Sequence, residues 1–244
     1  MQSTDVLYRQ IIGDPNHWFE TRLIIDGVGT FGEDEAFEVT TKHEMLTAEK
    51  LVGNATAGEL DVKMFLPSTA VPTMAKVMPQ IRACRIYEDE QQNSDWLAQG
   101  VFFVDTREVA RNDDGLDVLT IHGYDAMLKA ESPYNGRIVE DSTDAEMVEE
   151  IAYQMGVNVD PRTYALMTNE YTIPLPVGYT YREILGYIAS MYAGSFTMSE
   201  TGELRLVSVL ELPPATNYLI DQTGAAITFG EFVPGDGTDT RIFV

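Results

Sequence analysis

The sequence predicts an α+β fold in which a β-barrel-rich domain is joined to a small two-helix α+β domain. Strand-like runs dominate residues 1–132, whereas residues 133–210 contain two helical patterns that each begin with a capping signal. Residues 95–131 have the pattern of a β-meander and carry no catalytic motif. With 244 residues, of which 44% are hydrophobic, the chain is long enough to bury a substantial core.

Four runs before residue 95 predict strands, because apolar residues are concentrated in them or alternate with polar ones. These runs are residues 23–25, 36–40, 60–66 and 77–87. Pro67 and Pro72 bracket the loop that follows the third run. The polar residues 88–94 predict a solvated hairpin tip.

Within the meander, residues 100–109 and 116–122 predict the two strands of a hairpin. Between them, Asn and Asp side chains supply turn hydrogen bonds, and Gly115 tolerates a positive φ. In the second strand apolar residues fall on both faces, with Val118 on one face and Ile121 on the other. This pattern predicts a sheet that is covered on much of both sides, as in barrels and sandwiches.

Two helices are predicted after residue 133, each from a capping box, an apolar stripe and a terminal glycine. The capping boxes are Thr143 with Glu146 and Thr180 with Glu183, and the terminal residues are Gly156 and Gly194. We interpret the stripes as core packing rather than a cofactor site. They comprise Met147, Val148, Ile151, Ala152 and Met155, and then Ile184, Leu185, Ile188, Ala189 and Tyr192. Residues 195–198 and 203–210 predict a short hairpin.

Three regions follow from these patterns: a barrel domain of residues 1–132, an α+β domain of residues 133–210, and a carboxy-terminal region of residues 211–244. The third region begins with a stiff proline linker at residues 212–214 and continues with a predicted strand at residues 226–233. We expect it either to return to the first barrel or to start a second one, and the sequence leaves both arrangements open.

The chain is strongly acidic, with 16 Lys and Arg residues against 39 Asp and Glu residues and a net charge of −23. The acidity is not confined to a tail, because residues 1–122 carry 21 acidic and 10 basic residues. Binding to nucleic acid through phosphates needs clustered Lys and Arg, which the sequence lacks, so tight nucleic-acid binding is not expected. Such acidity serves solubility in general, and in a channel it keeps DNA from sticking.

The single cysteine, Cys84, cannot form an internal disulfide, which fits a reducing cytoplasm. We interpret it as a small apolar strand residue. No apolar run approaches the roughly 18–20 residues that cross a bilayer. The first ten residues also lack the basic and apolar regions of a cleaved signal, so neither membrane insertion nor signal-dependent secretion is expected.

Residues 27–32 match the glycine pattern of dinucleotide-binding loops, G-x-G-x-x-G. The residues that follow predict an acidic turn and a strand instead of the helix whose amino terminus would hold a pyrophosphate. In addition, Glu33, Asp34 and Glu35 would repel that group. We therefore predict a hairpin turn at this position.

No residue is predicted to be catalytic, cofactor-binding or metal-binding, and no cofactor is expected. The histidines are far apart in the sequence and belong to no zinc motif. They are His17, His43 and His122. His122 lies near Asp125 in the sequence, but no activated nucleophile accompanies this pair, so we expect a surface or interface histidine. Asp236 and Asp239 do not fill a calcium-loop pattern.

Four strings occur in order along the chain: residues 53–83, residues 96–97, residues 100–105 and residues 123–128. Together they resemble the tail-hub proteins of phages and bacterial prophages. These proteins belong to the wider baseplate-hub group that includes the spike proteins of type VI secretion. The resemblance extends over most of the chain before the proline linker, and none of its strings is a catalytic signature.

The resemblance implies a structural protein, not an enzyme, that forms a ring-shaped hub at the distal end of a tail tube. Such a hub is a trimer, connects the tube to a spike or fibre apparatus and leaves a channel for DNA. The implied partners are further copies of the chain, the distal tail or tube protein, the spike or fibre, and the tape measure protein. The implied location is the virion tail, assembled in the cytoplasm of the bacterial host.

Two alternative functions stay open. The first is a receptor- or carbohydrate-binding module of the tail, in which Trp96, Tyr179 and Tyr181 stack on sugar rings. The second is part of a tail-associated cell-wall hydrolase, although the sequence offers no recognisable nucleophile or metal set for it.

Overall fold

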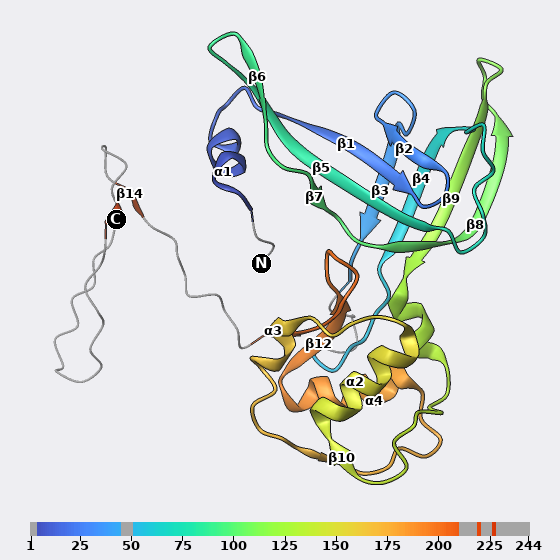
Figure 1. Ribbon diagram of the computed structural model, residues 1–244, viewed down its shortest axis with the longest axis vertical. Coiled ribbons are helices and arrows are strands. Elements are labelled where there is room, and N and C mark those ends of the chain that lie inside the picture. The colour runs from blue at the N-terminus through green and yellow to red at the C-terminus, as the bar shows by residue number, and fades with distance from the viewer. Residues whose placement is uncertain (1–3, 45–50, 210–218, 221–225, 228–244) are drawn as a thin grey trace. The chain divides into compact units, whose positions relative to one another are not determined.

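The chain folds into two compact units, residues 1–210 and residues 211–244. The computed structural model (Figure 1) describes residues 4–44, 51–209, 219–220 and 226–227.

In the second unit, β14 (Leu219–Ile220) and β15 (Ala226–Ile227) form an antiparallel pair. The strand predicted for residues 226–233 thus begins with β15. Its remainder lies outside the described residues, as does the predicted linker at residues 212–214.

The first unit contains a nine-stranded antiparallel sheet with the order β2-β1-β5-β8-β9-β4-β3, in which β6 and β7 also pair with β5. Figure 1 shows β1 and β5 running obliquely away from β8 and β9. The strands are β1 (Trp18–Ile25), β2 (Gly29–Gly32), β3 (Glu38–Lys42), β4 (Glu59–Phe65), β5 (Lys76–Tyr87), β6 (Glu90–Asn93), β7 (Leu97–Ala98), β8 (Phe102–Arg111) and β9 (Asp117–Asp125).

One face of this sheet buries an apolar cluster to which no helix in the described part of the chain contributes. Its strand residues are Leu23 and Ile25 of β1, Leu60, Val62 and Met64 of β4, Val77 of β5, Phe102 and Val104 of β8, and Leu119 and Ile121 of β9. Val71 and Ala75, from the loop between β4 and β5, complete the cover. Since these side chains are almost inaccessible without a helix over them, the sheet must curl over its own inner face.

The curled sheet confirms the predicted mixed fold with a large antiparallel sheet. A closed barrel is not found, because β2 and β3 stand at the two ends of the strand order and do not pair with each other within the described ranges. The outer face is covered in part by α1 (Val6–Ile12), whose Ile11 is fully buried. Cys84 in β5 is also fully buried, as expected for a small apolar strand residue.

The predicted hairpin at residues 27–32 is confirmed. Gly27 has φ 73°, and Ile25 of β1 is paired with Gly29 of β2. The polar tip predicted at residues 88–94 is shorter than expected. Only Glu88 and Asp89 make the turn, with φ values of 51° and 65°, and the residues after them form β6 against β5.

Both predicted helices are present, as α2 (Asp144–Met155) and α4 (Tyr181–Met191), and both capping boxes are formed. Gly156 ends α2 in the left-handed conformation, as predicted. Gly194 does not end α4, because the helix stops at Met191 and Gly194 is the first residue of β12 (Gly194–Met198).

The reason for Gly194 is a close approach between strands. A Cβ atom at this position would lie 2.6 Å from the carbonyl oxygen of Val207 in β13 (Leu204–Ser208). The glycine therefore permits the β12–β13 hairpin to start directly after the helix. The predicted hairpin itself is confirmed by the register from Gly194 opposite Ser208 to Met198 opposite Leu204.

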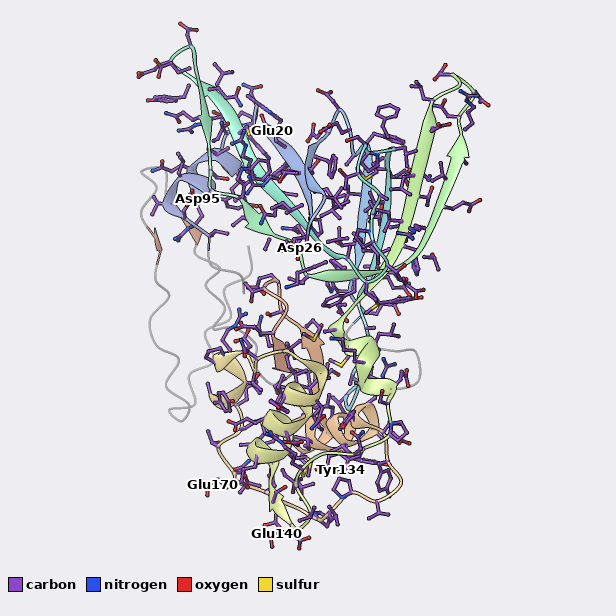
Figure 2. All side chains as sticks on the ribbon, turned by 45° about the vertical axis from the view of Figure 1, so that its right-hand side comes forward. Glu20, Asp26, Asp95, Tyr134, Glu140 and Glu170 are labelled. Carbon is purple, nitrogen blue, oxygen red and sulfur yellow. The ribbon has the colours of Figure 1, made fainter. Side chains whose placement is uncertain are left out.

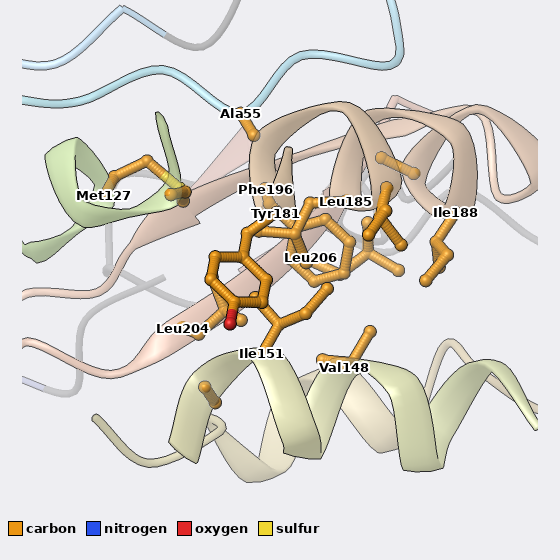
Figure 3. Packing of buried hydrophobic residues seen from close by; sticks show 14 of the residues in the cluster. Ala55, Met127, Val148, Ile151, Tyr181, Leu185, Ile188, Phe196, Leu204 and Leu206 are labelled. Atoms are coloured by element: carbon orange, nitrogen blue, oxygen red, sulfur yellow. The ribbon is translucent and has the colours of Figure 1, made fainter. Parts of the chain in front are cut away.

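The two helices and this hairpin enclose a second apolar cluster, shown from close by in Figure 3. Both predicted stripes lie in it, as core packing requires. The cluster also takes in Ala55, from the chain before β4, and Met127, from the 3-10 helix η1 (Ala126–Glu131) that follows β9. The remaining short elements are β10 (Ser142–Thr143), α3 (Pro161–Tyr164) and β11 (Thr172–Ile173).

No helix within the described residues is both long and apolar enough to cross a membrane.

We predict that Thr180→Ala lowers the free energy of unfolding by about 1 kcal/mol, because the hydroxyl of Thr180 accepts a hydrogen bond from the backbone N–H of Glu183 at 3.2 Å. Thr180→Ser keeps the hydroxyl and serves as the control. Urea denaturation followed by circular dichroism measures both. Equal loss in the two variants would contradict a capping role.

Candidate functional site

The structure separates the two residues that were considered as an acid–base pair. The Nδ1 atom of His122 lies 2.8 Å from Oδ1 of Asp61, on the outer face of the sheet. Asp125 is buried, with 2% of its surface exposed, and its oxygens accept hydrogen bonds from backbone N–H groups. His122 therefore belongs to an exposed cross-strand pair between β9 and β4.

The other two histidines contact backbone carbonyl groups. Nδ1 of His17 lies 2.6 Å from the carbonyl oxygen of Asp14, and Nε2 of His43 lies 3.4 Å from that of Gln99. Across the described ranges, no group of three or more His, Cys, Asp or Glu residues is arranged to hold a metal ion. Asp236 and Asp239 lie outside those ranges.

Trp96 is engaged by two arginines on the outer face of β1 and β5. The guanidinium carbons of Arg22 and Arg82 lie 4.3 Å and 4.6 Å from the centre of its rings. Arg82 is held in turn by Glu20, at 2.6 Å between nitrogen and oxygen; Glu20 is labelled in Figure 2. Cation–π contacts thus occupy the indole that a sugar would need for stacking.

Tyr179 and Tyr181 do not form a joint platform. Tyr181 is 3% exposed, packs edge-to-face on Tyr134 and belongs to the core. Tyr179 is 42% exposed and packs instead on the exposed Tyr187 of α4. Of the three aromatic residues named from the sequence, only Tyr179 presents a ring with a large exposed area.

Asp125 joins the two apolar clusters. Its Oδ2 accepts from the backbone N–H of Gly58, just before β4, at 2.7 Å. Its Oδ1 accepts from the backbone N–H of Met127 at 2.9 Å and so caps η1. Burial raises the pKa of Asp125 from its ordinary value of 3.8 to about 6, although both hydrogen bonds and the charge of Arg182 favour the ionised form.

A cavity of about 280 Å³ is lined by residues on both sides of this junction. Its lining includes the ion pairs Lys42–Glu44, at 2.9 Å, and Arg182–Glu131, at 2.8 Å. Both cations of the lining are thus already paired with carboxylates, and Glu59 adds a third carboxylate to it.

The outer face of β3, β4, β9 and β8 is polar between the apolar residues Phe65, Val118 and Ala110 at one end and Phe103 at the other, and we call this part the polar face. Directly paired residues of an antiparallel sheet point to the same side, so the registers define its members. They are Glu38, Thr40 and Lys42 of β3, Glu59, Asp61 and Lys63 of β4, Thr120, His122 and Tyr124 of β9, and Thr106 and Glu108 of β8. Lys63 and Glu38 form a cross-strand ion pair at 2.8 Å. This face thus carries four carboxylates and two lysines.

The distal half of β8 forms a second exposed surface. Every residue from Asp105 to Arg111 is exposed, and this part of the strand pairs only with β9, because β5 leaves β8 after Phe102 and Phe103. Val104 marks the boundary, since its backbone still bonds to Ala75 and Met74 at 3.0 Å. Beyond it, one edge of β8 is free.

We did not predict the role of Asp125 or the free edge of β8 from the sequence. Asp125 had a local signal, because an Asp before a short apolar run is typical of a helix cap. The free edge of β8 had none, since pairing partners of a strand cannot be read from its own residues.

The fold of this chain is similar to that of solved structures of tail proteins. Solved structures with this fold include the 43 kDa tail protein of prophage MuSo2 from Shewanella oneidensis, with a TM-score of 0.53 and 14% identity over 79% of this chain and 56% of that protein. A tail protein from Neisseria meningitidis MC58 has a TM-score of 0.50 and 12% identity over 77% of this chain and 50% of that protein. The chain spans about half the length of these proteins. No family model and no curated protein matches the sequence.

We predict that Asp125→Asn removes a part of the pH dependence of stability. A carboxyl group whose pKa is raised in the folded state stabilises the fold below pH 4, and this contribution is lost as the pH rises through about 6. Between pH 4 and pH 6.5 the unmodified protein should therefore lose up to about 3 kcal/mol relative to the variant. Urea denaturation at several pH values measures the difference, and parallel curves for the two proteins would refute it.

Proposed function

We propose that the chain is a structural component of a phage or prophage tail and has no catalytic activity. The proposal rests on the fold. Two tail proteins have a similar fold over more than three quarters of this chain. The similarity is one of fold, and the role in the tail is what we propose.

We further propose the finer role of a baseplate hub with a barrel-like first domain. The curled sheet of the first unit supplies a rigid wall, and its free strand edges supply surfaces for contacts between copies. In this role three copies form a ring at the distal end of the tail tube. The ring contacts the distal tail or tube protein, the spike or fibre and the tape measure protein in the virion tail, after assembly in the host cytoplasm.

The charge of the chain supports passage of DNA through such a ring. The net charge is −23, and the polar face carries an excess of carboxylates. A wall of this charge repels the phosphate backbone and so prevents tight binding within the channel.

We predict a trimeric mass by light scattering, in this chain or in a longer form that includes further native residues. The measurement belongs at about 0.15 M salt, because screening reduces the repulsion between highly acidic copies. A concentration series separates stable assembly from weak association. A monomer in every form at every concentration would refute the ring.

We also predict that the protein does not retard double-stranded DNA in a gel at low salt, where phosphate contacts are strongest. The polar-face variant Glu108→Lys with Asp61→Lys tests the cause, because it reverses two of the four carboxylates on that face. We expect measurable retardation by the variant and none by the parent. Tight, salt-sensitive binding by the parent would overturn the channel role.

A further inference from the structure

The free edge of β8 has a defined chemistry on each side. Beyond the irregularity at Asp105, Thr106 and Glu108 point to the polar face. Arg107 and Val109 point to the inner side, because they pair directly with the buried Ile121 and Leu119 of β9. Val109 is nevertheless 53% exposed. An apolar side chain on the inner side of an edge strand lacks the neighbour that a further strand would provide.

A second free edge lies at the end of the strand order, on β3. Among the described strands β3 pairs only with β4. Val39 and Thr41 point to the inner side, opposite Val62 and Leu60 of β4. Phe37, which precedes the strand, is 48% exposed.

The directions of the strands permit these two edges to join between copies. The block β8-β9-β4-β3 consists of four antiparallel strands, so β3 runs opposite to β8. If a second copy is placed beside the first in the same orientation, its β3 meets the edge of β8 in the antiparallel sense. A contact between two different surfaces repeats from copy to copy and closes into a ring when the rotation permits.

One register brings apolar side chains together on the inner side and places a lysine near a glutamate on the polar face. With Val39 opposite Val109, the partly buried Val39 of one copy covers the exposed Val109 of the other on the inner side. On the polar face Glu108 has Lys42 and Glu38 as its diagonal neighbours, and the charge of Glu38 is already offset by its ion pair with Lys63 at 2.8 Å.

We propose that the β8 edge of one copy pairs with the β3 edge of a second copy, with Val39 opposite Val109. The proposal deepens the proposed assembly into a ring and rests on it. The occupant of the edge is a second copy because the same chain supplies a free strand of matching direction, apolar pattern and charge.

Cysteine cross-linking tests this contact. Val39→Cys and Val109→Cys are introduced into separate proteins, which are mixed and oxidised at about 0.15 M salt, where charge repulsion is screened. Paired strands bring opposite Cα atoms within the range of about 4.4–6.8 Å that a disulfide requires. A bridge inside one chain is excluded, because β4 and β9 separate the two positions by roughly 14 Å. The native Cys84 is fully buried and burial raises the pKa of its thiol, so it can remain in place.

The matched control combines Val39→Cys with Val177→Cys, since Val177 is a still more exposed valine far along the sequence. We expect the first mixture to yield the cross-linked dimer in roughly tenfold excess over the control, because only paired strands hold the two positions in disulfide range. Mass spectrometry identifies the joined peptides. Thr41→Cys with Arg107→Cys probes the same register if a valine variant fails to fold.

Light scattering on the same samples separates this proposal from the proposed function. Copies that associate without enrichment of either cross-link would overturn the strand pairing and leave the ring intact. Copies that stay monomeric in every form would overturn both. Enrichment of the cross-link in associated copies supports both.

Discussion

The pairing of β9 along both of its edges is the constraint on which the rest of the first unit depends. β9 is paired with β4 over seven residues and with β8 over its whole length of nine residues. Its buried Leu119 and Ile121 lie at the centre of the first cluster, and its last residue, Asp125, caps η1 and ties down Gly58. A change of register in this strand would move the inner face outward and displace the start of the second cluster as well.

The sequence was most informative where local rules decide the structure. The two capping boxes fixed the starts of α2 and α4, and the alternation in residues 60–66 fixed the inner face of β4. In these places the side chain and the backbone group that it satisfies lie within four residues of each other. The candidate surfaces could not be predicted in this way, because the free edges of β8 and β3 depend on which distant strands fail to reach them.

The incorrect prediction for Gly194 has the same origin, and the arrangement of His122 and Asp125 shows the same dependence on distant residues. Gly194 carries the usual signal for the end of a helix, yet it is required by the carbonyl of Val207, thirteen residues further along the chain. His122 and Asp125 are close in sequence, but a strand places neighbours at odd spacing on opposite faces. His122 therefore meets Asp61 across the sheet, whereas Asp125 turns toward the buried junction.

The irregularity between Val104 and Thr106 decides which side chains of the distal half of β8 lie on each face of the sheet. If Asp105 paired regularly with His122, then Thr106, Glu108 and Ala110 would point inward, and Arg107, Val109 and Arg111 would point outward. One unpaired residue therefore exchanges the two faces without altering the composition of the strand that follows. Deletion of the Asp105 codon would keep each later residue opposite its present partner on β9 and remove only the irregularity, so the two faces depend on Asp105 staying outside the regular pairing.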